Sequence, residues 1–128
     1  PTIDRDLTPS TKDIKSFEEF SQNYPTSSYL SEALEKKELC RKKLAEKEYY
    51  IADFYLKREH YASAERRLKA ILRQYRNLGF DEKALFYLGF CYYQLKNKDK
   101  AKKVLTRLTE KFPESSFTDE AKKILKDL

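Results

Sequence analysis

The sequence is short of the residues on which most enzymes and metal proteins depend. Among its 128 residues are one histidine, His60, and two cysteines, Cys40 and Cys91, and there is neither methionine nor tryptophan. No CxxC pair occurs, so zinc and thiol redox motifs are excluded by count. No catalytic histidine arrangement and no Gly-rich phosphate loop can be found, so an enzyme, a cofactor site and a metal site are not expected. Whether Cys40 and Cys91 are bridged stays open, because nothing in the sequence places them within bonding distance.

Glycine, proline and long apolar runs are also scarce. Two glycines and four prolines favour long, rarely interrupted helices. No stretch approaches the roughly 20 apolar residues that cross a bilayer, and no signal peptide pattern opens the chain at Pro1. An apolar content of 40%, with 14% aromatics, is enough to form a core. The composition therefore predicts an all-α chain of one domain.

Charge of either sign is abundant but not segregated. Twenty-seven basic and 21 acidic residues give a net charge of +6. The two signs alternate, as in Glu35-Lys36-Lys37-Glu38, which is typical of a solvated helical surface. No nucleic-acid motif, arginine-rich arm or carboxylate-free stripe is present. We therefore expect no nucleic acid partner, and an acidic protein surface is the better candidate.

The strongest positive signal is a spacing that recurs along the chain. Its full copy consists of Leu85-x2-Leu88-Gly89-x2-Tyr92, Ala101-x3-Leu105 and Pro113. A second copy reads Glu48-x2-Ile51-Ala52-x2-Tyr55 and Ala64-x3-Leu68, with Arg76 in place of the proline. Asp13-x3-Phe17 with Pro25 is a half copy. This is the 34-residue helix-turn-helix pattern of a tetratricopeptide repeat, and such repeats stack into an α-solenoid that holds other molecules.

The repeat frame divides the chain into segments. We predict a half repeat over 8–25, an extended repeat over 29–76, a full repeat over 80–113 and a capping helix over 116–128, all in a single domain. Thr8 is the expected N-cap of the first helix, with Pro9 at its first position. One long helix should run from about residue 29 to residue 57. This repeat is 17 residues longer than a regular one, and we expect the extra residues to lie at the start of the long helix. Residues 77–79 add three residues to the next connection.

The long helix carries an apolar stripe that something must cover. Its members are Leu30, Ala33, Leu34, Cys40 and Leu44. The first helix could pack along this stripe, or the stripe could be an open groove for a partner. Because the array starts with the second half of a repeat, Phe17 and Phe20 lack a first helix. We therefore expect the C-terminal part of a longer protein, with self-association through this face as a hazard.

The first helix of each stacked pair lines a concave surface, and the frame places one acidic and four aromatic residues there. These residues are Tyr49, Asp53, Phe86, Phe90 and Tyr93. Contiguous exposed aromatics mark binding surfaces, but the terminal helix or the long helix could also fold over them. An acidic residue and phenyl rings cannot hold a carboxylate. The carboxylate-binding type of chaperone adaptor is therefore excluded.

Arg66, Arg67 and Arg73 form the densest arginine cluster, on the second helix of the middle repeat. The planar guanidinium suits bidentate pairing with carboxylates at interfaces. Pairing with Glu65, or solvation, is the alternative.

Several motifs together resemble one particular family. They are Asp4-Arg5-Asp6-x-Thr8, Phe17-Glu18-Glu19-Phe20, Tyr24-Pro25-x-Ser27-x-Tyr29 and Arg41-x2-Leu44-Ala45-x2-Glu48-x2-Ile51-Ala52-x-Phe54-Tyr55-x2-Arg58. The combination resembles the BamD family of outer-membrane-protein assembly lipoproteins. The resemblance runs over nearly the whole chain and includes the long helix, and it corresponds to the C-terminal portion of that family.

The resemblance implies a periplasmic scaffold of the β-barrel assembly machinery, anchored to the outer membrane only through a lipid upstream of this sequence. It implies binding of accessory lipoproteins and of the barrel-proximal POTRA domain of BamA, where Arg67 matches a family arginine. Two alternatives stay open. One is another periplasmic repeat adaptor for envelope enzymes, and the other is a cytosolic adaptor that binds peptides with Phe86, Phe90 and Tyr93.

Overall fold

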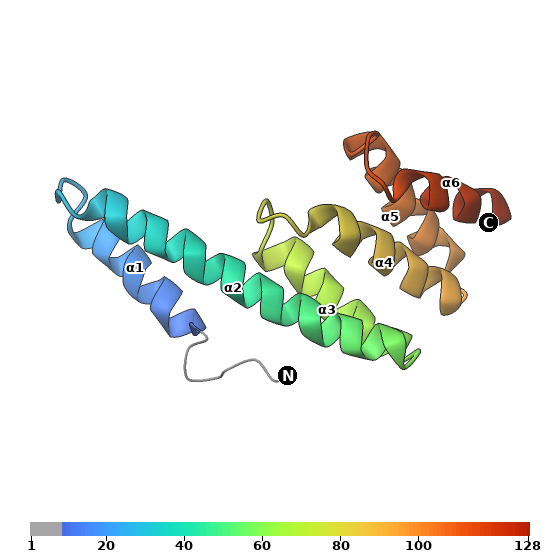
Figure 1. The fold of residues 1–128 in the computed structure, drawn as a ribbon, viewed down its shortest axis with the longest axis horizontal. Helices are drawn as coiled ribbons and strands as arrows, with labels where there is room; N and C mark the ends of the chain where they lie inside the picture. The colour runs from blue at the N-terminus through green and yellow to red at the C-terminus, as the bar shows by residue number, and fades with distance from the viewer. Residues whose placement is uncertain (1–8) are drawn as a thin grey trace. The chain divides into compact units, whose positions relative to one another are not determined.

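A computed structural model describes residues 9–128, and within them every regular element is a helix. The helices are α1 (Thr11–Asn23), α2 (Leu30–Lys57), α3 (Tyr61–Gln74), α4 (Asp81–Gln94), α5 (Lys98–Lys111) and α6 (Thr118–Asp127) (Figure 1). The all-α prediction is confirmed. Within this range no helix is both long and apolar enough to span a membrane. The motif Asp4-Arg5-Asp6-x-Thr8 lies outside the described residues.

The chain divides into two compact units, one ending at Lys47 and the other running from Glu48 to Leu128. The boundary falls inside α2, so this helix contributes its first half to one unit and its second half to the other. A single domain therefore stays a prediction.

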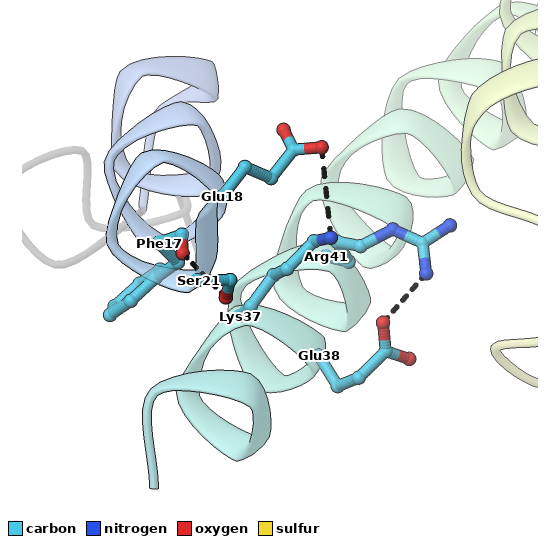
Figure 2. A network of polar contacts seen from close by, with 6 residues as sticks. All are labelled: Phe17, Glu18, Ser21, Lys37, Glu38 and Arg41. Atoms are coloured by element: carbon cyan, nitrogen blue, oxygen red, sulfur yellow. Dashed lines mark hydrogen bonds and ion pairs between the residues drawn. The ribbon is translucent and has the colours of Figure 1, made fainter. Parts of the chain in front are cut away.

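The first unit pairs α1 with the first half of α2. The N-cap of α1 is Ser10, whose backbone N–H donates to Asp13 Oδ2 at 2.6 Å. The expected cap at Thr8 lies outside the described residues, and Pro9 precedes the helix because Ser10 has extended backbone angles. Glu18 of α1 and Lys37 of α2 form an ion pair at 3.7 Å, and Arg41 pairs with Glu38 at 2.7 Å (Figure 2).

The predicted stripe on α2 is not uniformly covered. Leu44 is buried, whereas Leu30, Ala33 and Cys40 are half-buried and Leu34 is exposed. Since α1 itself contains no buried residue, the first unit has little core of its own.

The second unit holds the core. One cluster joins Ala52 of α2 to α3 and α4 through Ala64, Leu68, Ile71 and Leu88. The other cluster joins α4, α5 and α6 through the buried residues Leu85, Phe86, Leu105, Leu108 and Ala121. Small residues at the crossings let helix backbones approach closely. A Cβ on Gly89 would lie only 2.5 Å from Leu105 Cγ, so this position requires glycine.

The two cysteines are free thiols. Cys91 is fully buried in the first core cluster, and burial raises the pKa of its thiol to about 12. Cys40 is half-buried on α2. The bridge that the sequence left open is absent.

Both turns inside a repeat have the same backbone geometry. Glu59 and Lys96 adopt positive φ angles of 59° and 63°. The next residue in each turn, His60 or Asn97, donates its N–H to Tyr55 or Tyr92 at 2.9 Å. The only histidine of the chain is thus a turn residue.

The connections between repeats are also alike. Tyr24, Tyr75 and Phe112 each end a helix by donating their N–H to the carbonyl four residues before. Each is followed, at the same distance along the chain, by an aromatic residue that starts the next helix: Tyr29, Phe80 and Phe117. The sequence analysis predicted that residues 77–79 are an insertion in this connection. The prediction is wrong, because all three connections have the same length. Arg76 in place of proline leaves the helix end unchanged.

The extra length lies in α2 alone. This helix has 28 residues, twice the 14 residues of α3, α4 and α5. The predicted extension of 17 residues is therefore too long. Three of the 17 residues belong to a connection, and the other connections contain the same three positions. The extra length of α2 is the difference between a helix of 28 residues and one of 14 residues.

Candidate functional site

The arginines of α3 occupy different environments. Arg67 Nη1 donates to both carboxylate oxygens of Glu48 at 3.3 Å. The Arg67 side chain keeps 42% of its surface exposed, against 22% for Glu48. Only one of its guanidinium nitrogens is used in this ion pair, so the others remain able to pair with a partner's carboxylate.

Arg66 and Arg73 are both exposed. Arg66 makes a long hydrogen bond of 3.4 Å to Ser63 Oγ. Because they are separated by two helical turns, these two arginines lie on one side of α3. The cluster thus has one arginine anchored by an acid and two that face solvent.

Glu65 does not pair with these arginines. Its carboxylate lies 3.6 Å from Lys69 Nζ and accepts a hydrogen bond from Tyr92 of α4. Burial, reinforced by this hydrogen bond, raises the pKa of Tyr92 to about 12. The acidic partner of Arg67 is instead Glu48, which lies 19 residues away on α2. The sequence did not identify this pair, and only the repeat frame, which puts α2 beside α3, could have indicated it.

The five residues predicted for the concave surface differ in burial: one is buried and four are half-buried. Phe86 is buried and stacks on Phe117 with ring centroids 5.1 Å apart. Tyr93 donates from its hydroxyl to Asp127 of α6. The C-terminal segment thus covers Phe86 and contacts Tyr93. The aromatic groove remains a prediction, and it now rests on Tyr49, Asp53 and Phe90.

Tyr49, Asp53 and Phe90 are half-buried. Phe90 meets Tyr61 edge-on with ring centroids 5.8 Å apart. Asp53 pairs with Lys57 one turn along α2 at 2.9 Å. Its charge is therefore balanced within its own helix.

One cation in this region was missed by the sequence reasoning. Lys83 Nζ lies 4.2 Å from the ring centroid of Tyr49 and 4.7 Å from that of Phe80. The rings attract the ammonium through their negative faces. Burial also raises the pKa of the Tyr49 hydroxyl, with smaller contributions from Tyr87 and Asp53. The sequence does not reveal the contact with Tyr49, because this residue lies on α2 whereas Lys83 lies on α4.

This surface has the chemistry of protein recognition. Aromatic rings and arginines are the groups that dominate protein interfaces. Across residues 9–128, no group of three or more metal-ligating side chains comes together.

Comparison with known proteins gives a consistent result. The sequence model of a family described as YfiO, outer membrane lipoprotein, matches residues 2–107. The outer membrane protein assembly factor BamD of Neisseria gonorrhoeae is 30% identical over 118 residues, which are 92% of this chain and 44% of that protein. BamD of Rickettsia prowazekii is 30% identical over 112 residues, 88% of this chain and 45% of the relative.

A more distant relative extends the match further. BamD of Caulobacter vibrioides is 26% identical over 125 residues, 98% of this chain and 41% of the relative. The chain spans less than half the length of the curated relatives that it matches.

Proposed function

Because this chain belongs to the YfiO family of outer membrane lipoproteins, we propose that it is a non-catalytic scaffold of the machinery that assembles β-barrel outer membrane proteins. It works by binding other proteins rather than by chemistry. Its partners are the barrel-proximal POTRA domain of BamA and accessory lipoproteins of the same machinery. Its location is periplasmic, at an outer membrane to which a lipid anchor outside these residues would tether it.

The observation that carries the proposal is the family match. It covers residues 2–107, and so includes the 28-residue helix α2. General tetratricopeptide arrays alternate helices of similar length, so a match through a helix of double length is specific. The relatives' names describe an assembly factor.

The geometry of α3 supports a partner contact through its arginines. Arg67 is held by Glu48, so little side-chain entropy remains to be lost when a partner carboxylate binds. Arg66 and Arg73 add charge on the same helix. An acidic patch on a partner would meet three guanidinium groups, which favours bidentate pairing.

The proposal is tested by calorimetry of this chain with the isolated barrel-proximal POTRA domain of the same organism. Arg67→Glu should weaken binding at least tenfold, about 1.4 kcal/mol. Arg107→Glu on α5 makes the same charge change at an exposed position and should leave the affinity unchanged.

A second variant separates binding from folding. Arg67→Glu places two carboxylates together, which could destabilise the chain, whereas Glu48→Gln removes the ion pair and leaves the arginine. Glu48→Gln should fold and bind within about threefold of the wild type, a free-energy change of roughly 0.6 kcal/mol. A folded chain with no measurable POTRA affinity would contradict the proposed partner.

A second candidate function is a peptide-binding adaptor, either for envelope enzymes in the periplasm or in the cytosol. The observations in its favour are that Tyr49, Phe90 and Tyr93 are half-buried and that Lys83 lies above the Tyr49 ring. Phe90→Ala distinguishes the two functions, because it should abolish peptide binding at this surface and leave POTRA binding through α3 intact.

A further inference from the structure

The excess positive charge of the chain is concentrated on two helices of the second unit, although the two signs alternate along much of the sequence. Helix α5 contains six basic and two acidic residues, a net charge of +4, and α3 contains four basic and one acidic residue, a net charge of +3. Together they carry +7, whereas the whole chain carries +6. The remaining residues, taken together, are therefore nearly neutral, and α5 has the larger share of the excess.

The basic residues in the middle of α5 all face solvent. Residues 100–109 contain no carboxylate, and each of their four cations is exposed: Lys100, Lys102, Lys103 and Arg107. The two acids of the helix, Asp99 and Glu110, flank this segment. The helix packs against the core through other residues, which are Ala101, Leu105 and Leu108.

Three of these cations are not neutralised by the protein itself. Within residues 9–128, Lys102, Lys103 and Arg107 form no ion pair. On α3, by contrast, Arg67 and Lys69 are each paired with a glutamate. An open hollow of about 490 Å³ lies among the side chains of α5, and it is lined by Asp99, Lys102, Lys103, Thr106, Arg107 and Glu110. The outer face of α5 is therefore a surface of unpaired positive charge.

The composition of this face differs from that of a protein interface. Every large apolar side chain of α5 is at least half-buried, and three of the four cations in residues 100–109 are lysines. Protein interfaces are enriched in aromatic residues and arginine and depleted in lysine. Lysine is a hydrated point charge on a flexible stem, which can follow phosphate groups that move in a lipid surface. Anionic headgroups therefore fit this face better than a folded acidic protein.

We propose that the face of α5 formed by Lys100, Lys102, Lys103 and Arg107 binds the anionic headgroups of a membrane surface. The chain belongs to a family of outer membrane lipoproteins, so a membrane is within reach. Each lysine or arginine close to an anionic membrane strengthens binding roughly fivefold. The contact is electrostatic, because this face has no exposed apolar side chain that could enter the hydrocarbon core. The inference rests on the membrane location of the family and not on the proposed POTRA contact through α3.

The test is cosedimentation of the chain with lipid vesicles at low salt. Vesicles of phosphatidylcholine and phosphatidylglycerol in equal parts should bind the chain, whereas vesicles of phosphatidylcholine alone should not. Binding should fall steeply as sodium chloride is added, because salt screens exposed charges. Lys102→Glu combined with Lys103→Glu should weaken binding to the anionic vesicles by more than about tenfold.

The chain offers a matched control on α2. Lys42 and Lys43 are likewise neighbouring exposed lysines within a helix, but Glu38 and Glu46 stand about one turn away on either side. Lys42→Glu combined with Lys43→Glu makes the same change in net charge. It should weaken vesicle binding by less than about twofold, since the attraction of a membrane for a charge falls off within a Debye length. Circular dichroism checks that both double variants keep their helices.

Two outcomes would overturn the proposal. Equal losses in the two double variants would mean that the vesicles respond to net charge alone, which would refute the site on α5. A folded chain that does not bind phosphatidylglycerol at low salt would refute it as well, and would leave an acidic protein surface as the ligand of this face. Reversal of Lys102 and Lys103 should leave the affinity for the POTRA domain unchanged in calorimetry, so either proposal can fail while the other stands.

Discussion

Gly89 shows how one residue determines the distance between two helices. A Cβ at this position would lie 2.5 Å from Leu105 Cγ, well inside van der Waals contact, and Leu105 is fully buried. The side chain of Leu105 has no free space into which to move. The close crossing of α4 and α5 therefore depends on the missing methyl group.

Gly89→Ala should destabilise the chain by about 1–2 kcal/mol, because overpacking outweighs the gain in helix propensity. Urea unfolding followed by circular dichroism measures this change. Gly79→Ala is the comparison, since nothing lies within 4 Å of its Cβ position but φ is +95°. That variant should lose about 1 kcal/mol from backbone strain alone. An unchanged midpoint for Gly89→Ala would contradict the packing argument.

Some residues of the candidate site could be predicted from the sequence, whereas their contacts with other helices could not. Arg66, Arg67 and Arg73 could be identified from the sequence, because clustered arginines on one helix are visible as such. The anchoring of Arg67 by Glu48, and the position of Lys83 above Tyr49, could not. Both depend on pairs of helices brought together by tertiary packing.

At the scale of the helix, the sequence predicts the second unit best. The repeat pattern predicts helices over residues 61–74 and 98–111, and α3 and α5 have these bounds. In each case a turn residue with positive φ precedes the helix and an aromatic residue caps its end. The same pattern predicts a helix over residues 80–96, but α4 ends at Gln94, and Lys96 adopts a positive φ in the turn. Burial of Phe86 was unpredictable, since it depends on where the segment after Pro113 returns.

The connection between α5 and α6 packs on α4 through aromatic contacts. Phe117 stacks on Phe86 and meets Tyr87 edge-on, with ring centroids 5.1 and 5.8 Å apart. Ser115 Oγ accepts from the Phe117 N–H at 3.1 Å and fixes the ring's position. The side chains Lys122, Lys123 and Lys126 of α6 are exposed, and a capping role for this helix stays a prediction.

Phe117→Ala should lower the free energy of unfolding by about 2 kcal/mol, less than for a fully buried phenylalanine because the ring is half-buried. Thermal unfolding and hydrogen exchange in α6 measure the effect, and exchange should rise in α6 before α3. Phe54→Ala removes a ring that is 44% exposed and should cost less than about 1 kcal/mol. Equal losses in the two variants would show that Phe117 does not anchor α6.

Of the two units, the second contains the hydrophobic core and the first contains few buried residues. Every residue of the two core clusters falls between Tyr49 and Leu128. In the first unit only Leu44 and Ala45 are buried among the described residues. Stability is therefore concentrated in the second unit.

A chain of residues 48–128 should fold by itself, with a cooperative urea transition and a circular dichroism spectrum of a helical protein. A chain of residues 9–47 should be largely unfolded, because helix pairs of fewer than about 40 residues bury too little apolar surface. Nuclear magnetic resonance of each piece distinguishes the two outcomes. A broad, non-cooperative transition for residues 48–128 would mean that the core needs the first half of α2.

The likeness of the three connections has an evolutionary consequence. Tyr24, Tyr75 and Phe112 end their helices in the same way, and Tyr29, Phe80 and Phe117 start the next ones at the same distance. A gene that is duplicated or shortened with breakpoints inside these connections therefore rejoins ends that already fit. Such a coding sequence can change its number of helix pairs by recombination without passing through a misfolded ancestor, so relatives of different length are an expected product of its descent.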